Sequence, residues 1–188
     1  MITDGWLTEK PLARADQRVK HCPSPNFNER PSHCLIDLIV VHNISLPPNQ
    51  FGGGYIEQFF QNNLDHTAHP YFQTIDGLKV SSHCLITRDG GLVQFVSFLD
   101  RAWHAGVSEY CGKTQCNDFS VGIELEGADD IPYEAIQYKR LADLINELLK
   151  AYPSLSIREI VGHSDIAPGR KTDPGPAFDW STLKQLLE

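Results

Sequence analysis

Residues 162–175 read Gly-His-Ser-Asp-Ile-Ala-Pro-Gly-Arg-Lys-Thr-Asp-Pro-Gly. Just before them, residues 157–161 are rich in β-branched side chains, which is typical of a strand. His163 is therefore expected where a strand ends and a loop stiffened by proline begins. Strand ends are where open α/β sheets place their chemistry. A stiff loop that presents His163, Lys171 and Asp173 indicates a metal site or an acid–base site, and a surface turn with a solvated charge pair is the competing interpretation.

Two further strand-like runs carry groups that titrate or bind metals. Residues 34–42 are nearly continuous in apolar β-forming residues, as in a central strand covered on both faces, and the run ends at His42. Residues 119–126 alternate, which places Glu124 and Glu126 on the face opposite the apolar residues. Glu124 is the candidate for chemistry. Glu126, nearer the next turn, is expected to face solvent or to support the site.

The remaining pattern predicts a mixed β-sheet flanked by α-helices in a single α/β domain. Two β-rich runs, 80–87 and 92–96, flank an Asp-Gly pair, which is a hairpin signal and requires antiparallel strands. Residues 1–33 contain several prolines and no sustained periodicity, and we interpret them as an N-terminal arm packed on the body. Residues 34–188 then form that body.

Three segments are predicted to be helical. Residues 55–60 form a short helix after a glycine-rich loop. Residues 132–152 have apolar residues at helical spacing, with Asp129 or Asp130 placed as the N-cap. Asp179 is predicted to cap a closing helix.

The charge of the chain limits its partners. The 188 residues include 16 basic and 24 acidic ones, for a formal net charge of −8. This balance argues against nucleic acid, whose binding depends on clustered lysine and arginine. No apolar run approaches the roughly 20 residues of a membrane span, so no membrane partner is expected. The N-terminus lacks a signal-peptide pattern and the five cysteines form no Cys-x-x-Cys pair, which together predict a cytoplasmic protein with reduced thiols.

The candidate residues can form one site. If the three strands lie in one sheet, His42, Glu124, His163 and Asp173 can converge at one edge. Two neutral imidazoles and one carboxylate are a catalytic zinc set, and zinc lowers the pKa of bound water to about 7 for hydrolysis of amides or esters. Glu124 is then the candidate for proton transfer and Lys171 for stabilising the oxyanion. A lone histidine at a strand end is more often structural, however, and no self-contained motif such as His-Glu-x-x-His is present.

Two more residues are candidates for contact with a substrate: Trp103 by stacking and Asn43 by hydrogen bonding. His83 and His104 are interpreted as structural residues or as supports of the site.

Six segments resemble the AmpD-type 1,6-anhydro-N-acetylmuramyl-L-alanine amidases, in the right order and over nearly the whole chain. They are residues 41–48, 101–108, 116–120, 122–127, 165–168 and 171–180. The resemblance implies the fold shared by peptidoglycan-recognition proteins and type 2 amidases. It implies one zinc ion per chain, held by His42, His163 and Asp173, with Glu124 and Lys171 catalytic.

The resemblance also implies the reaction and the substrate. Residues 34–188 become a zinc amidase domain that cleaves the amide between 1,6-anhydro-N-acetylmuramic acid and L-alanine, during cytoplasmic recycling of cell-wall fragments. The partner is then a small molecule, and we expect a monomer. Family members often have basic residues, thought to grip the acidic stem peptide, where this chain has Lys79 and Gln115. Lys79 keeps the charge without the bidentate geometry of arginine, and Gln115 keeps only hydrogen bonding.

Two alternatives belong to other classes of protein. A peptidoglycan-fragment binding module of the same fold would have lost zinc and turnover, and such loss normally shows as a replaced ligand. A thiol hydrolase would use Cys84 or Cys116 with a histidine, but nothing near these residues indicates an activated thiol.

Overall fold

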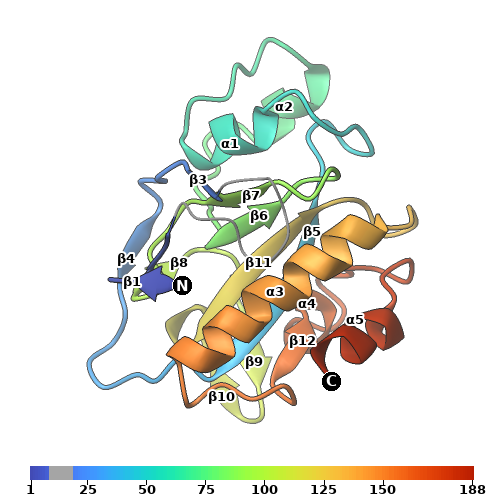
Figure 1. The fold of residues 1–188 in the computed structure, drawn as a ribbon. Helices are drawn as coiled ribbons and strands as arrows, with labels where there is room; N and C mark the ends of the chain where they lie inside the picture. The colour runs from blue at the N-terminus through green and yellow to red at the C-terminus, as the bar shows by residue number, and fades with distance from the viewer. Residues whose placement is uncertain (9–18) are drawn as a thin grey trace.

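A mixed sheet of six strands forms the centre of the computed structural model, which describes residues 1–8 and 19–188. The strands lie in the order β12-β5-β11-β6-β7-β3 (Figure 1). Their bounds are β3 Val19–His21, β5 Leu38–Ile44, β6 Cys84–Ile86, β7 Leu92–Gln94, β11 Ser120–Glu126 and β12 Ile160–Gly162. Neighbours are parallel except β6 and β7, the hairpin that the Asp-Gly pair predicts. The predicted mixed α/β fold is confirmed.

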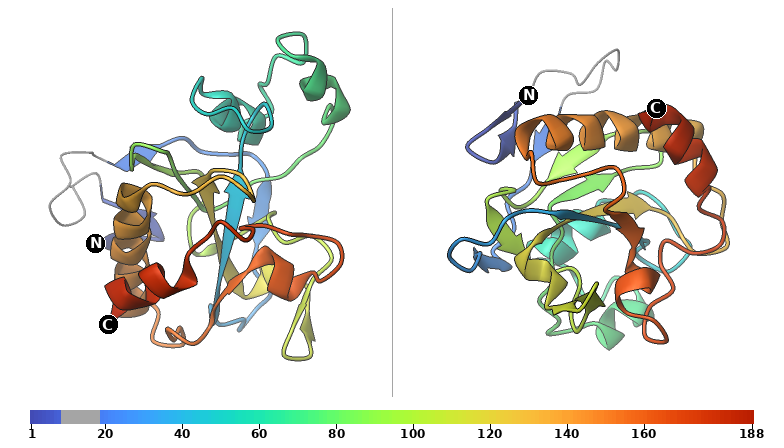
Figure 2. Two further views of the ribbon diagram at one scale, coloured as in Figure 1. Left: turned by 90° about the vertical axis from the view of Figure 1, so that its right-hand side faces the viewer. Right: turned by 90° about the horizontal axis from the view of Figure 1, so that it is seen from below.

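Helices lie on both sides of this sheet. They are α1 Tyr55–Phe60, α2 Pro70–Thr74, α3 Ala135–Ala151, α4 His163–Ile166 and α5 Trp180–Leu187, with a 3₁₀ turn at Cys116–Asp118. Helices α3 and α5 cover one side, and α1 and α2 lie beyond the other (Figure 2). Leu141, Leu144 and Leu148 of α3 pack in one apolar cluster with β11, whereas Phe60 and Phe72 belong to a second cluster with β6 and β7. The sheet therefore has an apolar core on each face.

Strand β11 lies at the centre of the parallel part of the sheet, and all seven of its residues are buried. Its apolar face packs under α3, as the alternation predicts, and the opposite face is covered as well. Glu126 is only 5% exposed, so the expectation that it faces solvent is wrong. Its carboxylate accepts the backbone N–H groups of Gly52 and Arg88, which ties the loop before α1 to the β6–β7 hairpin.

The ends of some elements differ from the prediction. Helix α3 begins at Ala135 with Glu134 as its N-cap, so the N-cap predicted at Asp129 or Asp130 is wrong. The Glu134 N–H donates to Oε1 of Gln137 (3.0 Å), and this local contact replaces the aspartate cap. The cap predicted at Asp179 is confirmed, since its carboxylate accepts the N–H groups of the first turn of α5.

Short strands also pair outside the main sheet. They form small two-stranded ribbons, which pair β1 Ile2–Thr3 with β2 Trp6–Leu7, β4 Phe27–Glu29 with β8 Asp100–Ala102, and β9 Glu109–Tyr110 with β10 Lys113–Thr114. Within the segment predicted as an arm, 1–33, residues 9–18 lie outside the described part. The rest supplies β3 to the edge of the main sheet and pairs β4 with β8. A boundary between arm and catalytic domain at residue 33 stays a prediction.

Within the described residues, no helix combines the length and the apolar character that crossing a membrane requires.

Burial of His83 should make the folded state sensitive to acid. Its Nδ1 accepts the Gly122 N–H (3.0 Å) and its Nε2 lies 3.1 Å from the Asp100 carbonyl oxygen. Burial, and secondarily the charge of Arg30, lower the pKa of His83 to about 3. The unfolded chain, with a histidine pKa near 6.5, therefore binds more protons between these values. His83 therefore does not lower the free energy of unfolding above about pH 6.5. Below that pH it lowers the free energy of unfolding by about 1.4 kcal/mol for each pH unit, down to its pKa of about 3 in the folded protein.

Urea unfolding of metal-free protein between about pH 6.5 and pH 5, above most carboxylate titrations, measures this loss. His83→Gln should reduce the slope of the free energy of unfolding against pH by the contribution of one titrating histidine. His33→Asn, which removes an exposed ring, should leave the slope unchanged. Equal slopes in wild type and His83→Gln would show that His83 is not the group that titrates on unfolding.

Candidate metal and catalytic site

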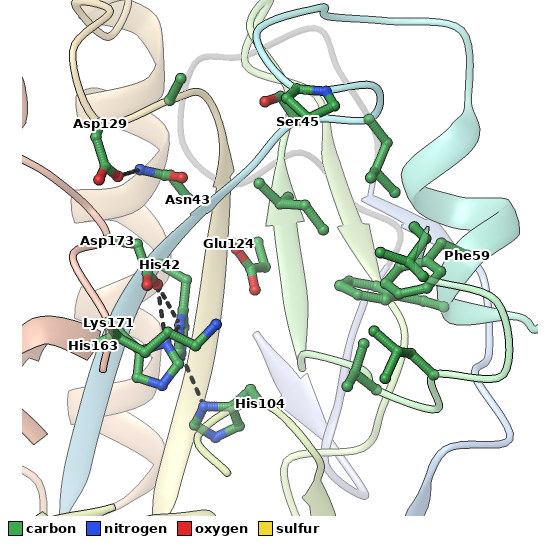
Figure 3. A pocket seen from close by; sticks show the side chains of 18 of the residues that line it. His42, Asn43, Ser45, Phe59, His104, Glu124, Asp129, His163, Lys171 and Asp173 are labelled. Atoms are coloured by element: carbon green, nitrogen blue, oxygen red, sulfur yellow. Dashed lines mark hydrogen bonds and ion pairs between the residues drawn. The ribbon is translucent and has the colours of Figure 1, made fainter. Parts of the chain in front are cut away.

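Two histidines and an aspartate meet at the carboxyl ends of β5 and β12. Val41 of β5 pairs with Gly162 of β12, so the next residues, His42 and His163, lie side by side. Their Nδ1 atoms are 3.0 Å apart, and each is 3.0 Å from Oδ2 of Asp173, in the loop after α4 (Figure 3). The Gly162 N–H donates to Oδ2 of Asp165 (2.7 Å), and the chain turns into α4 here instead of the predicted loop. Parallel register thus brings His42 and His163 together, and the loop after α4 adds Asp173.

The electrostatics of this cluster favour metal ligands in their binding forms. His42 and His163 are 2% and 3% exposed. Burial lowers the pKa of His42 to about 4, so the imidazole is neutral near pH 7. Burial alone would raise the pKa of Asp173, but hydrogen bonds from His163 and His42 hold this pKa below its ordinary range. A neutral His42 imidazole and an ionised Asp173 carboxylate are therefore present together, in the forms that bind a metal.

The spacing of the three donor atoms also suits a metal ion. A tetrahedral site with ligand bonds of about 2.0–2.1 Å places neighbouring ligand atoms about 3.3 Å apart. The separations of 3.0 Å in this cluster are only a few tenths of an ångström shorter. Each imidazole also has a partner for its other nitrogen, which is the usual arrangement for metal-binding histidine. The residues fit a single metal ion.

Glu124 stands beside this cluster on β11, paired in register with His42. Its side chain faces the space in front of the histidines (Figure 3). It is buried, and Oε2 has no hydrogen-bond partner within the described part of the chain. Burial, together with the charge of Asp173, raises the pKa of Glu124 well above its ordinary value, against the opposing effect of Lys171. Glu124 is thus a carboxyl group that holds its proton more tightly than an ordinary glutamate, which suits a residue that takes up and releases protons.

The cluster lies on one side of a cleft of about 620 Å³. Lys171 is on the same side, and its side chain extends into the cleft between Glu124 and His104 (Figure 3). The opposite wall is mainly apolar and includes Phe59, which faces the polar groups across the opening (Figure 3). The lining residues that share one apolar cluster with Phe59 are Leu46, Phe60, Tyr71, Ile75 and Val80. A ligand in this cleft would contact charged groups on one side and aromatic rings on the other.

Comparisons with known proteins show the family to which this chain belongs. A sequence profile of the N-acetylmuramoyl-L-alanine amidases matches residues 29–176. The chain belongs to this amidase family. The 1,6-anhydro-N-acetylmuramyl-L-alanine amidase AmpD of Citrobacter freundii is 49% identical over 187 residues, which span all of this chain and 95% of the relative. The resemblance seen in the sequence is therefore confirmed.

Solved structures of amidases agree with the fold. The crystal structure of a selenomethionine derivative of AmpD has a TM-score of 0.92 and 49% identity, covering all of this chain and 99% of that chain. The amidase AmiD of Escherichia coli, solved in complex with its substrate anhydro-N-acetylmuramic acid-L-Ala-D-γ-Glu-L-Lys, has a TM-score of 0.58 and 28% identity. That alignment covers 86% of this chain and 65% of AmiD.

In this amidase, two of the residues predicted to touch substrate line the cleft. The Asn43 side-chain nitrogen donates to Oδ1 of Asp129 (2.7 Å) and to the Pro174 carbonyl oxygen (3.1 Å). Asn43 therefore also holds the loop that carries Asp173. The Trp103 ring is fixed by its own N–H, which donates to Oδ1 of Asn28 (2.7 Å) on β4.

The other two predicted substrate residues lie outside the lining of this cleft. Lys79 lines a separate hollow of about 150 Å³ beside His66 and Asp76. Gln115 lines a hollow of about 540 Å³ with Arg101 and Arg170. Contact of Lys79 or Gln115 with the substrate of the amidase stays a prediction.

Two further residues lie beside the candidate site. Asp129, predicted as one of two alternative helix caps, holds Asn43 instead, and sequence reasoning missed this role because the two residues are 86 positions apart. His104, interpreted from the sequence as a structural residue or a support of the site, has its Nδ1 2.9 Å from Nε2 of His42.

Proposed function

We propose that this chain is a zinc-dependent amidase that cleaves the bond between 1,6-anhydro-N-acetylmuramic acid and the L-alanine of the stem peptide. The convergence of His42, His163 and Asp173 beside the buried Glu124 carries the proposal. The full-length similarity to AmpD supports the choice of substrate, and the AmiD complex supports a small-molecule ligand for this fold.

Zinc would be held by Nδ1 of His42, Nδ1 of His163 and Oδ2 of Asp173. When bound, it supplies a Lewis acid that polarises the amide carbonyl and lowers the pKa of water. Glu124 takes the proton from the attacking water and delivers it to the leaving nitrogen, and its raised pKa suits both steps. The Lys171 ammonium, which lines the cleft, stabilises negative charge on the former carbonyl oxygen.

The two walls of the cleft give a physical basis for binding such a substrate. The polar wall holds the amide at the reacting groups, whereas the aromatic wall offers apolar contact to the sugar ring and excludes water. Lys79 and Gln115 would contact the stem peptide beyond the cleft. We place the enzyme in the cytoplasm, as a monomer in the recycling of wall fragments, on the basis of its full-length similarity to the AmpD relatives.

Removal of metal should stop the reaction reversibly. Purified protein should release free peptide from anhydro-muramyl tripeptide, with products identified by mass. Turnover should cease after dialysis against a chelator and return with one equivalent of zinc, because residues 1–8 and 19–188 contain one such cluster of ligands. Binding of the muropeptide without any release of peptide would instead identify a recognition module, and turnover that survives chelation would reject the zinc mechanism.

A further inference from the structure

One short turn, formed by residues 103–106 (the 103–106 turn), contacts both histidines of the proposed metal site on the side away from the metal position. Nε2 of His42 lies 2.9 Å from Nδ1 of His104, and Nε2 of His163 lies 3.1 Å from the Ala105 carbonyl oxygen. The two contacts come from consecutive residues. A displacement of this turn would therefore affect both imidazoles at once.

The direction of the hydrogen bonds follows from metal binding through Nδ1. A metal takes the lone pair of Nδ1, so the proton of His42 is on Nε2 and must be donated to Nδ1 of His104. His104 then carries its own proton on Nε2, which lies 3.2 Å from the Ser120 Oγ. The Ser120 hydroxyl in turn donates to the Cys116 carbonyl oxygen (2.5 Å). Every donor in this series of hydrogen bonds has an acceptor, and only one set of histidine tautomers satisfies all of them.

Three other contacts hold the 103–106 turn in place. Oδ1 of the buried Asn117 accepts the N–H groups of both His104 (3.1 Å) and Ala105 (2.8 Å). Nη2 of Arg170 donates to the Ala105 carbonyl oxygen (2.7 Å), the atom that His163 also contacts. The imidazole of His104 lies directly over Gly122 of β11, where a Cβ atom would come within 2.4 Å of the ring. The lack of a side chain at Gly122 thus leaves space for the His104 ring on the central strand β11.

We propose that His104 is a positioning residue of the metal site. Its Nδ1 accepts the Nε2–H of His42, and this fixes the tautomer and the ring orientation that direct Nδ1 of His42 to the metal. The Ala105 carbonyl does the same for His163, so the 103–106 turn supports both imidazole ligands. The inference rests on the proposed zinc site and adds a role for a residue outside the ligand set.

Zinc affinity, measured by competition with a chromogenic chelator, tests this role. His104→Leu keeps much of the volume but removes the acceptor, and should weaken zinc binding by about 10–100-fold, the usual cost of losing the partner of a ligand. His104→Asn, whose Oδ1 can take the place of Nδ1, should restore most of the affinity. His33→Asn is the matched control, because it removes one exposed imidazole away from the site. Urea unfolding of the metal-free variants separates misfolding from loss of affinity.

A second readout needs no variant. In zinc-loaded wild type, nuclear magnetic resonance should find the His42 proton on Nε2, slow to exchange with water. The proton on Nδ1 of His42 would overturn the inference, even if His104→Leu fails to fold. Unchanged zinc affinity in a folded His104→Leu, with only a raised KM for muropeptide, would also overturn it and assign His104 to substrate contact. In both cases the proposed function stands, whereas absence of zinc binding by wild type rejects both proposals.

Discussion

Asp173→Ala should lose zinc and turnover together. Asp173 supplies the only carboxylate of the ligand set, and its Oδ2 lies 3.0 Å from Nδ1 of both histidines. The loss of affinity should exceed the 10–100-fold that removal of a mere supporting partner costs, since a ligand itself is gone. Metal content after gel filtration and the release of peptide from anhydro-muramyl tripeptide measure the two effects.

Asp130→Ala is the matched control for this variant. Asp130 is an exposed carboxylate that lines the same cleft, so its removal changes local charge without changing the ligand set. It should retain stoichiometric zinc. If Asp173→Ala also retains one zinc ion per chain, Asp173 is not a ligand and the proposed metal site is wrong.

Glu124→Gln should bind zinc normally and turn over about 10²–10⁴ times more slowly. Glutamine keeps the shape of the side chain beside His42 but cannot exchange a proton with the attacking water or the leaving nitrogen. Because burial raises the pKa of Glu124 in the folded protein, wild type should lose activity as pH falls and this carboxylate becomes protonated. The variant should lack that limb of the pH profile.

Glu126→Gln serves as the control for a buried carboxylate on the same face of β11. Its carboxylate contacts backbone N–H groups of Gly52 and Arg88, and no part of the mechanism assigns it a proton. The acid limb should therefore persist in Glu126→Gln, whatever its rate. Wild-type kcat in Glu124→Gln would transfer the proton role to another group.

The sequence was sufficient for the features that depend on local pattern. The apolar run before His42 and the alternation around Glu124 predict two strands, and the Asp-Gly pair predicts the hairpin. Strand ends could then be named as candidate positions, and parallel pairing brings His42 next to both Glu124 and His163. The family resemblance, by contrast, was needed to choose Asp173 as the ligand, because spacing alone left the carboxylate open.

What the sequence could not supply depends on distant contacts. His42 meets His104 across 62 residues, and Asn43 meets Asp129 across 86, so no window of the chain contains either pair. The start of α3 was misplaced for another reason. Glutamate is a less favoured cap than aspartate, yet the contact between Glu134 and Gln137 fixes the helix start there. Strand β3, with three residues, is too short to show a period.

The separation of the ligands along the chain has a consequence for biosynthesis. His42 and Asp173 are 131 residues apart, which a ribosome takes roughly 7–26 s to add at about 5–20 residues per second. For the first 121 residues of that interval the nascent chain holds His42 without either of its two partners. Strand β12 and the loop after it complete this edge of the sheet, so the proposed metal site cannot close before Asp173 has been made. Zinc loading of the proposed site would therefore follow synthesis of all three ligands.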